Sequence, residues 1–242
     1  GVTLDKSVLA RDQNQKVFSQ TFEEFSGRMV PPRVARGSNM LKQYGSVLGR
    51  IEQTYGVPGE IIVAIWGLET DFGVNLGKFQ TLRSLASLAY DCRRSDLFKA
   101  ELMDALRIVE RGDIPPQDLR GAWAGEIGQT QFMPSNYIKY AVDFDGNGRR
   151  DLLRNVPDVL ASTANYFAKA AGGWKMGVPW GFEVLVPKGF DLMKSSAAFN
   201  EWARLGVKRA DGKAFPSTGD GILFFPAGLP GPAFIVTPNF EV

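Results

Sequence analysis

The chain of 242 residues contains no histidine and only one cysteine, Cys92. Without histidine, the sequence excludes Ser-His-Asp and Cys-His nucleophile systems and any zinc site that needs an imidazole ligand. A lone cysteine excludes an internal disulfide. Acid–base chemistry near neutral pH therefore falls to a carboxyl group, a lysine, a tyrosine or the one thiol.

Long apolar runs and an excess of one charge are also missing. The longest apolar stretch, Ile61 to Trp66, is far shorter than the ~20 residues that a membrane span needs, so we expect no transmembrane segment. The 28 Lys and Arg residues nearly balance the 26 Asp and Glu residues, which argues against a nucleic-acid partner. Hydrophobic residues make up 44% of the chain and charged residues 22%, and these ordinary values exclude wholesale disorder.

Helical patterns fill most of the chain, and short β-like runs follow Trp174. Apolar residues at spacings of three and four predict helices, and alternating or β-branched runs between Pro and Gly predict strands. The predicted helices are 39–55, 59–70, 81–90, 95–110, 135–142, 157–171 and 196–205, and the predicted strands are 182–186, 221–225 and 233–237. The fold class is therefore α+β, mainly α. We expect a helical core over residues 1–173 and a small β-containing lobe over residues 174–242, packed on the core.

One carboxyl group stands out on an apolar helix face. On a helix, Glu69 shares its face with Ile62, Ile65 and Trp66. These neighbours are expected to reduce the hydration of the carboxylate and so to raise its pKa. A glutamate with a raised pKa suits a general acid at neutral pH. The simpler alternative is that Glu69 ends an apolar helix and reaches solvent or a buried arginine.

Three motifs, in order, resemble the lytic murein transglycosylase B family. They are GLETDFG at 67–73, GAWAGEIGQTQFMPSNY at 121–137 and ANYF at 164–167, and the match runs from about Arg36 to Phe240. The resemblance implies that the helical core is lysozyme-like and that Glu69 is the only catalytic carboxyl group. It implies a murein lytic transglycosylase, a carbon–oxygen lyase that cleaves the MurNAc-β-1,4-GlcNAc bond of peptidoglycan without water and leaves 1,6-anhydroMurNAc ends.

A single carboxyl group needs help from the substrate, because ordinary glycosidases use two. Glu69 would protonate the bridging oxygen and then take the proton of the C6 hydroxyl, while the N-acetyl group of MurNAc assists at the anomeric carbon. Three alternatives stay open. They are a hydrolytic muramidase, in which water replaces the C6 hydroxyl, a non-catalytic peptidoglycan-binding protein, and a calcium-dependent interaction module.

The resemblance also implies residues that line the saccharide site. These are Gln131, Tyr166, Arg93, Arg94, Phe132, Met133 and Tyr137. An amide can pair with acetamido groups, and guanidinium groups suit the carboxylates of the peptide stem and lactyl group. From the residues alone, core packing explains Phe132 and Met133 equally well. A tyrosine at the spacing of Tyr166 usually lies in the core with its hydroxyl at the rim, a loop glutamine such as Gln131 is usually exposed, and a solvated face explains the arginine pair.

One position departs from the family pattern. Many relatives have a serine where this chain has Ala122, and that hydroxyl can hydrogen-bond the catalytic carboxyl. A main-chain amide or Tyr166 is therefore expected to orient Glu69 instead.

Residues 143–154 follow the pattern of an EF-hand loop, and members of the family carry one such calcium loop. The expected ligands are Asp143, Asp145, Asn147, Arg149 through its backbone carbonyl, and Asp151. Arg154 occupies position 12, where a bidentate carboxylate belongs, so we expect weak and purely structural calcium binding. A metal-free turn held by Asx hydrogen bonds is the alternative. Catalysis is expected to need no cofactor.

The resemblance places the protein in the periplasm, with a lipid on an upstream cysteine as one means of anchoring it to the outer membrane. Peptidoglycan glycan strands are the implied partner, and the sequence identifies no partner among cell-wall synthesis or division proteins. Relatives continue past Phe240 into a helix with substrate contacts. Because the sequence ends at Val242, we expect part of the substrate contacts to be absent from it.

Overall fold

The computed structural model describes residues 3–14, 20–170, 172–229 and 231–242. Its internal contacts divide the chain into two compact units, one of Gly1–Ser19 and Arg28–Tyr166 and one of Gln20–Gly27 and Phe167–Val242. The sequence pattern changes near Trp174, but the contacts divide the chain earlier, at Phe167. The reason is that the Trp174 amide donates to the Phe167 carbonyl at 2.8 Å and the two rings pack edge to face, with centroids 6.4 Å apart.

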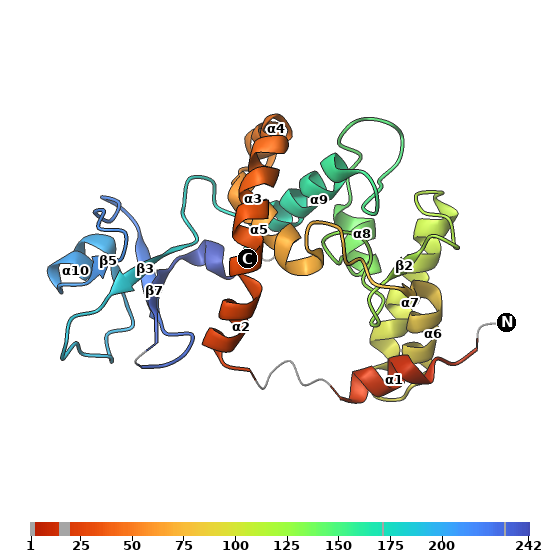
Figure 1. Ribbon diagram of the computed structural model, residues 1–242, viewed down its shortest axis with the longest axis horizontal. Coiled ribbons are helices and arrows are strands. Elements are labelled where there is room, and N and C mark those ends of the chain that lie inside the picture. Colours follow the sequence, from red (N-terminus) through yellow and green to blue (C-terminus); the bar gives the residue numbers. More distant parts are fainter. Residues whose placement is uncertain (1–2, 15–19, 171, 230) are drawn as a thin grey trace. The chain divides into compact units, whose positions relative to one another are not determined.

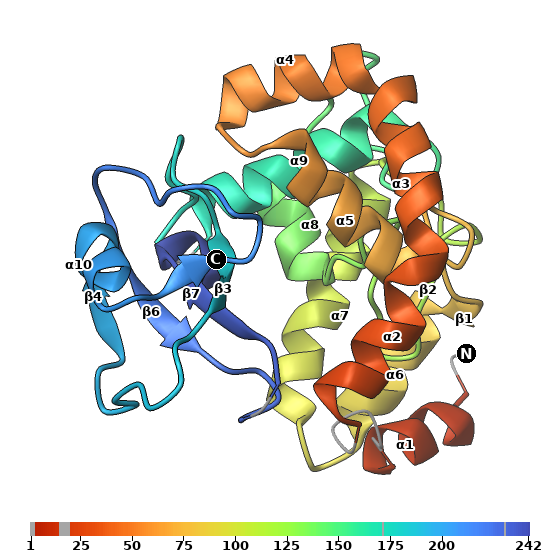
Figure 2. The same ribbon diagram turned by 60° about the vertical axis from the view of Figure 1, so that its left-hand side comes forward.

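The first unit is built from helices (Figures 1 and 2). These are α1 (Lys6–Gln13), α3 (Pro31–Gln43), α4 (Gly45–Tyr55), α5 (Gly59–Thr70), α6 (Thr81–Tyr90), α7 (Ser95–Glu110), α8 (Pro134–Tyr140) and most of α9 (Val156–Lys169). A further helix, α2 (Phe22–Met29), contains residues of both units. The predicted helices 59–70, 81–90 and 95–110 are confirmed with the same bounds. The predicted end at residue 171 lies outside the described residues. None of the helices described is long and apolar enough to cross a membrane.

The prediction of one continuous helix over 39–55 is wrong. The helix α3 ends at Gln43 and α4 begins at Gly45, because Tyr44 leaves the helical conformation with φ −103° and ψ 13°. The Tyr44 ring packs edge to face on the ring of Trp66 in α5, with centroids 5.7 Å apart. This long-range contact coincides with the break, and an apolar spacing pattern cannot report it.

The Gly-rich segment between α7 and α8 is more ordered than a loop. The strand β1 (Phe79–Gln80) pairs antiparallel with β2 (Arg120–Gly121), and two single bridges, Gly121 to Ile127 and Ile127 to Phe132, fold the segment back on itself. At its end, the Glu101 carboxylate of α7 accepts the Ser135 amide at 2.9 Å and so fixes the start of α8. The 121–133 segment is thereby held from both sides.

The second unit contains a five-stranded antiparallel sheet with strand order β4-β6-β7-β3-β5. Its elements are β3 (Gly181–Leu185), β4 (Ser196–Ala198), α10 (Phe199–Arg204), β5 (Lys208–Arg209), β6 (Asp220–Phe224), β7 (Ala233–Val236) and the 3-10 helix η2 (Pro238–Phe240). The three predicted strands are confirmed to within one residue at each end. The predicted helix 196–205 is only partly correct, because its first three residues pair with β6 as strand β4.

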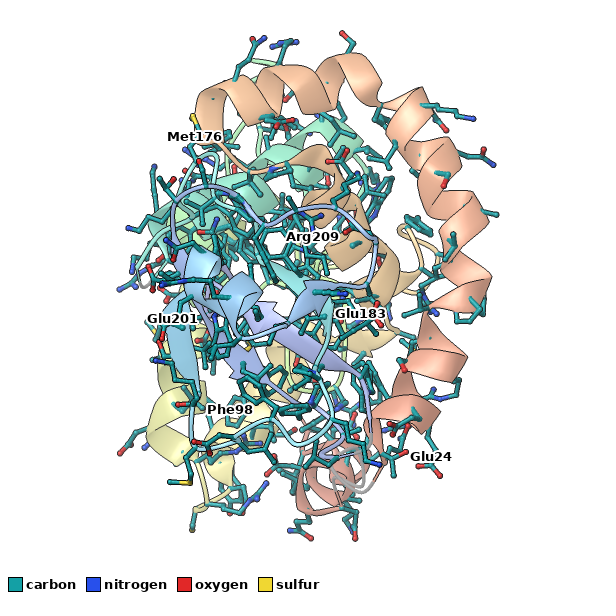
Figure 3. The ribbon with its side chains drawn as sticks, turned by 90° about the vertical axis from the view of Figure 1, so that its left-hand side faces the viewer. Glu24, Phe98, Met176, Glu183, Glu201 and Arg209 are labelled. Carbon is teal, nitrogen blue, oxygen red and sulfur yellow. The ribbon has the colours of Figure 1, made fainter. Side chains whose placement is uncertain are left out.

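The core of this unit forms between the sheet and α10. Trp202 is fully buried, and its indole N–H donates to the Gly221 carbonyl at 3.2 Å. Charged residues complete the surface: Glu201 pairs with Lys194 at 2.8 Å, and the Arg209 guanidinium lies 4.3 Å from the centroid of the Phe182 ring (Figure 3). The alternating burial along β6 is the period-2 pattern of a sheet with one face in the core.

Candidate active site

Glu69 lies in the last turn of α5. Ile62 and Trp66 are buried, Ile65 is partly buried, and Glu69 itself is exposed. The surrounding protein nevertheless reduces its hydration enough to raise the pKa of its carboxyl group, and the charge of Glu126 raises that pKa further. The direction predicted from apolar neighbours is thus confirmed. Its second cause lies in a loop that the sequence did not connect with Glu69.

The chain leaves α5 through a strained turn. Asp71 and Phe72 have φ values of 55° and 57°, and among the described residues the only other non-glycine residue with positive φ is Gln131, at 52°. The turn needs Gly73, because a Cβ atom there would lie 2.4 Å from Oε1 of Gln129. Such conformations persist only where the surroundings enforce them, and they cluster at functional sites. Here they fall in the two long motifs.

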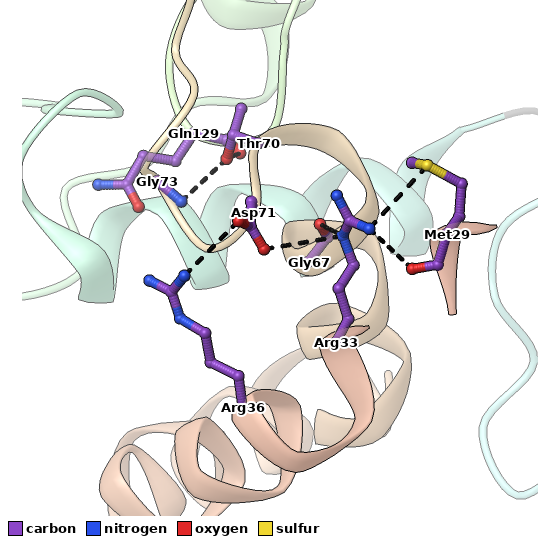
Figure 4. A network of polar contacts seen from close by, with 8 residues as sticks. All are labelled: Met29, Arg33, Arg36, Gly67, Thr70, Asp71, Gly73 and Gln129. Atoms are coloured by element: carbon purple, nitrogen blue, oxygen red, sulfur yellow. Dashed lines mark hydrogen bonds and ion pairs between the residues drawn. The ribbon is translucent and has the colours of Figure 1, made fainter. Parts of the chain in front are cut away.

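Asp71 is directed toward α3 and its arginines (Figure 4). Its carboxylate lies 3.8 Å from Nε of Arg33 and 3.7 Å from Nη1 of Arg36. Arg33 also donates from Nε to the Gly67 carbonyl at 2.7 Å. These contacts fix the end of the helix that carries Glu69, and they engage Asp71 with α3.

Gln129 joins the second motif to α5. Its buried side-chain oxygen accepts the indole N–H of Trp66 at 2.8 Å, and its side-chain nitrogen donates to the Leu153 carbonyl at 2.9 Å. Its backbone carbonyl accepts the Thr70 hydroxyl at 2.5 Å. Because Thr70 follows Glu69 directly, these three bonds set where the 121–133 segment lies relative to the candidate acid.

Glu126 is the site residue that sequence reasoning missed. Burial raises the pKa of its carboxyl group, against hydrogen bonds from backbone groups of Glu126 and Ala124 and the charge of Arg94, which lower it. Its Oε2 atom is buried without a hydrogen-bond partner among the described residues. The available signal was a charged residue between Gly125 and Ile127, inside a motif otherwise made of small, apolar and amide side chains.

Several predicted saccharide-binding residues lie together. The Phe132 and Tyr166 rings are 5.7 Å apart, and Tyr166 packs edge to face on Tyr140 at 5.2 Å. Phe132 is 6% exposed, whereas Tyr166, Met133 and Gln131 are partly buried. Gln131 donates from its side-chain nitrogen to the Gly128 carbonyl at 2.8 Å, which leaves its side-chain oxygen as an acceptor for a ligand.

Arg93, Arg94 and Tyr137 make contacts within the protein. Both arginines hold the buried carboxylate of Asp12 in α1. Burial alone would raise the pKa of Asp12, but the hydrogen bonds from the two arginines bring it below its ordinary value. Tyr137 is 0% exposed, and its hydroxyl donates to the Arg150 carbonyl. This position is one of core packing, out of reach of a saccharide at the surface.

Three carboxylates gather in the EF-hand-like loop. Oxygen atoms of Asp143, Asp145 and Asp158 lie within 4.8 Å of one another. The sequence pattern did not include Asp158, because this residue lies in α9, beyond the twelve-residue loop. It is fully buried, and its carboxylate accepts the amides of Phe144 at 2.8 Å and Asp151 at 3.0 Å. This donor set of carboxylate oxygens suits a hard divalent cation.

The rest of the loop contains the Asx hydrogen bonds of a turn. Asp143 accepts the amides of Asn147 at 3.0 Å and Gly148 at 2.7 Å, and the Asn147 side chain accepts the Arg149 amide at 3.0 Å. Arg154, at the position of the missing twelfth ligand, pairs with Asp118 at 2.9 Å. Its charge is therefore partly compensated by a carboxylate outside the loop.

The model of the transglycosylase SLT domain family matches residues 1–242 of the chain. Membrane-bound lytic murein transglycosylase B of Escherichia coli (strain K12) is 43% identical over 150 residues, which are 62% of this chain and 41% of that protein. The chain thus spans less than half the length of this relative.

Solved structures agree with this family match. SltB3 from Pseudomonas aeruginosa, solved in complex with NAG-NAM-pentapeptide and with NAG-anhNAM-pentapeptide, has a TM-score of 0.87 and 40% identity over 100% of this chain and 66% of that chain. The E. coli lytic transglycosylase Slt35 in complex with calcium has a TM-score of 0.80 and 31% identity over 99% of this chain and 76% of that chain. These similarities confirm the predicted α+β, mainly helical, lysozyme-like fold.

Proposed function

The chain belongs to the transglycosylase SLT domain family, and on that basis we propose that it is a murein lytic transglycosylase that cleaves the MurNAc-β-1,4-GlcNAc bond of peptidoglycan strands. The observation that carries this proposal is Glu69, an exposed carboxyl group with a raised pKa at a strained helix end. The complexes of SltB3 with NAM and anhNAM fragments support the same substrate and product classes for this chain.

In the first step, the protonated carboxyl group of Glu69 gives its proton to the bridging oxygen. The bond between this oxygen and C1 of MurNAc breaks, its electron pair stays on the oxygen, and GlcNAc leaves with a free 4-hydroxyl. The N-acetyl carbonyl oxygen of MurNAc bonds to C1 and takes the place of a second enzymatic carboxylate.

In the second step, Glu69 acts as a base. Its carboxylate takes the proton of the C6 hydroxyl, and the C6 oxygen attacks C1 and displaces the acetamido oxygen. A 1,6-anhydro ring closes, Glu69 is protonated again, and no water is consumed. One carboxyl group thus serves both steps, and the reaction needs no metal ion or other cofactor.

The neighbouring side chains provide a binding surface. Gln131 would accept a hydrogen bond from an acetamido group or donate one to it. Phe132, Met133 and Tyr166 would contact the apolar faces of the sugars. The side chains of Arg93 and Arg94 are 50% and 38% exposed despite their contact with Asp12. Both would therefore keep N–H groups for the carboxylates of the peptide stem.

Product analysis tests the proposal against hydrolysis. Purified peptidoglycan is digested with the protein, and the released muropeptides are separated and weighed by mass spectrometry. We expect MurNAc ends that are lighter than reducing ends by one water molecule. Reducing ends alone would assign the chain to the hydrolytic muramidases.

The pH dependence of the rate is expected to follow Glu69. The first step needs the protonated carboxyl, so the rate falls about tenfold per pH unit above its pKa. Because that pKa is raised, the falling limb should lie above the ordinary glutamate value of about 4.3. Initial rates of anhydro-product formation between pH 4 and 9 measure the position of this falling limb. A limb at the pKa of an ordinary glutamate would contradict the environment described for Glu69.

Calcium binding to the 143–158 segment is proposed as a structural feature. Asp143, Asp145 and Asp158, whose oxygen atoms lie close together, would hold the ion. Asn147, Asp151 and the Arg149 carbonyl, which the loop pattern predicts as ligands, would be further oxygen donors. Burial and the charges of Asp145 and Asp143 raise the pKa of Asp158, and a bound cation would relieve this repulsion. The complex of Slt35 with calcium supports the assignment.

Calcium should therefore stabilise the fold modestly. With a dissociation constant of about 1 mM, 10 mM calcium adds about 1.4 kcal/mol to the free energy of unfolding. Thermal unfolding with calcium or with chelator measures this increase. The Asp143→Asn and Asp145→Asn double variant is the control and should not respond. An equal response in the variant would place calcium elsewhere.

The proposed location is the periplasm, where the peptidoglycan substrate lies. The relative in E. coli is described as membrane-bound, which supports a site of action at the cell envelope. We propose that, where the protein is attached to the outer membrane, a lipid on an upstream cysteine anchors it.

A further inference from the structure

Glu126 is held in one place by its own loop. Its carbonyl oxygen accepts the Ala122 amide at 3.2 Å, and a Cβ atom on Gly121 would lie 1.7 Å from the same oxygen. Only glycine permits this close approach of two backbone segments. The next residue, Ile127, is fully buried and bridges to both Gly121 and Phe132. The backbone at Glu126 therefore has little freedom to move its carboxylate away.

The same loop is fastened to the end of α5 beside the candidate acid. The Thr70 hydroxyl donates to the Gln129 carbonyl at 2.5 Å, and the Trp66 indole donates to the Gln129 side chain at 2.8 Å. Glu69 directly precedes Thr70, and Glu126 lies three residues before Gln129. These bonds bring the loop of Glu126 to the end of α5 that carries Glu69, and the charge of Glu126 acts on the Glu69 carboxyl group there.

Glu126 forms no ion pair with a cation among the described residues. Its Oε2 atom is buried and has no hydrogen-bond partner among the described residues. The cation whose charge reaches it is Arg94, which uses Nη2 to hold Asp12 and whose Nε is also buried without a described partner. The arginines of α3, which packs against α5, pair with Asp71. The negative charge of Glu126 therefore acts on Glu69 without a direct ion pair to a described cation.

We propose that Glu126 is a positioning residue whose buried carboxylate, on a loop fastened to the end of α5, keeps the proton on the Glu69 carboxyl until the bridging oxygen of the substrate can accept it. This inference rests on the proposed role of Glu69 as the acid. Two carboxyl groups that share a site cannot both ionise easily. Burial opposes the ionisation of both, but backbone hydrogen bonds and the charge of Arg94 favour the carboxylate form of Glu126, so the proton stays on Glu69. Ala122 carries no hydroxyl that could hydrogen-bond Glu69, and the effect proposed for this loop is the charge of Glu126.

The test is a titration of the Glu69 carboxyl by carbon-13 NMR in the wild type, in Glu126→Gln and in Glu60→Gln. Glu60 is an exposed residue in the first turn of the same helix, about 13 Å from Glu69 along the helix axis. The Glu60→Gln substitution therefore removes one charge at a distance where salt screens most of its effect on Glu69. We expect the Glu69 midpoint to fall by about one pH unit in Glu126→Gln and to stay unchanged in Glu60→Gln.

Activity provides the second measurement. In Glu126→Gln the alkaline limb of the pH–rate profile should move to lower pH together with the Glu69 midpoint. At any pH above both limbs, the rate of the variant should then be about tenfold below that of the wild type. Glu126→Asp keeps the charge and should restore most of the wild-type limb. A merely structural role would lower the rate at all pH values without moving the limb.

An unchanged Glu69 midpoint in Glu126→Gln would overturn the inference and leave the proposed function standing. Anhydro products from Glu69→Gln would instead overturn the proposed function, whatever the titration of Glu69 gives. If Glu126→Gln does not fold, as judged by circular dichroism, Glu126→Ala removes the unpaired oxygen altogether and carries the same expectation.

Discussion

Glu69→Gln should abolish the formation of 1,6-anhydroMurNAc ends and leave the fold intact. A positioned general acid or base contributes about 10²–10⁴-fold to a rate. The same carboxyl serves in both proposed steps, so we expect a loss at or beyond the upper end of this range. Because Glu69 is exposed, the amide replaces the acid without a cavity or a buried unpaired group. The measurement is the rate of anhydro-muropeptide release by the variant and the wild type.

Two controls separate lost chemistry from lost structure. Glu60→Gln removes a carboxyl group from the other end of α5 and should keep the wild-type rate. The melting temperature of Glu69→Gln should match that of the wild type, and the variant should still sediment with peptidoglycan. If Glu69→Gln lysed peptidoglycan as fast as the wild type, the catalytic assignment would be wrong and a non-catalytic binding protein would be favoured.

Gln129→Leu should both destabilise the first unit and lower activity. The change leaves the Trp66 indole N–H and the Leu153 carbonyl without the partners they have at 2.8 and 2.9 Å. Each buried polar group without a partner costs about 1–3 kcal/mol, so we expect the free energy of unfolding to fall by about 3 kcal/mol. Denaturant unfolding followed by tryptophan fluorescence measures the change, and the anhydro-product assay measures the loss of rate.

The matched control is Gln53→Leu in α4. Gln53 is exposed, so the same chemical change should alter the free energy of unfolding by no more than about 0.5 kcal/mol. If Gln129→Leu and the wild type unfolded at the same denaturant concentration, the hydrogen bonds of the Gln129 side chain would not be what holds the second motif to α5. The positions assigned to Glu126 and Gln131 would then lose their support.

Local patterns predicted much of the fold and the central residue of the site. Local patterns predicted the bounds of α5, α6 and α7, and for α5 these were the turn residues 56–59 before it and Gly73 after it. Alternation gave the three longer strands of the second unit. Glu69 could be identified because the feature that marks it, a carboxyl group on an apolar helix face, lies within one turn of helix.

Contacts between distant residues could not be obtained in this way. Glu126 is 57 residues from Glu69, and Asp158 lies in a helix beyond the loop that it completes. Tyr137 was predicted as a saccharide ligand because the motifs name residue types, whereas its burial depends on how the helices pack. The contact of the arginine pair with Asp12 likewise depends on that packing.

The sequence by itself therefore determined which helix carries the proposed acid, which chemistry the lack of histidine excludes, and to which family the chain is similar. The tertiary structure decided which second carboxylate acts on that acid, which oxygen atoms gather in the 143–158 segment and which predicted ligands are buried. The physical reason is that hydrophobic periodicity acts between neighbours along the chain, whereas the pKa of a carboxyl group depends on every charge and apolar group that folding brings around it.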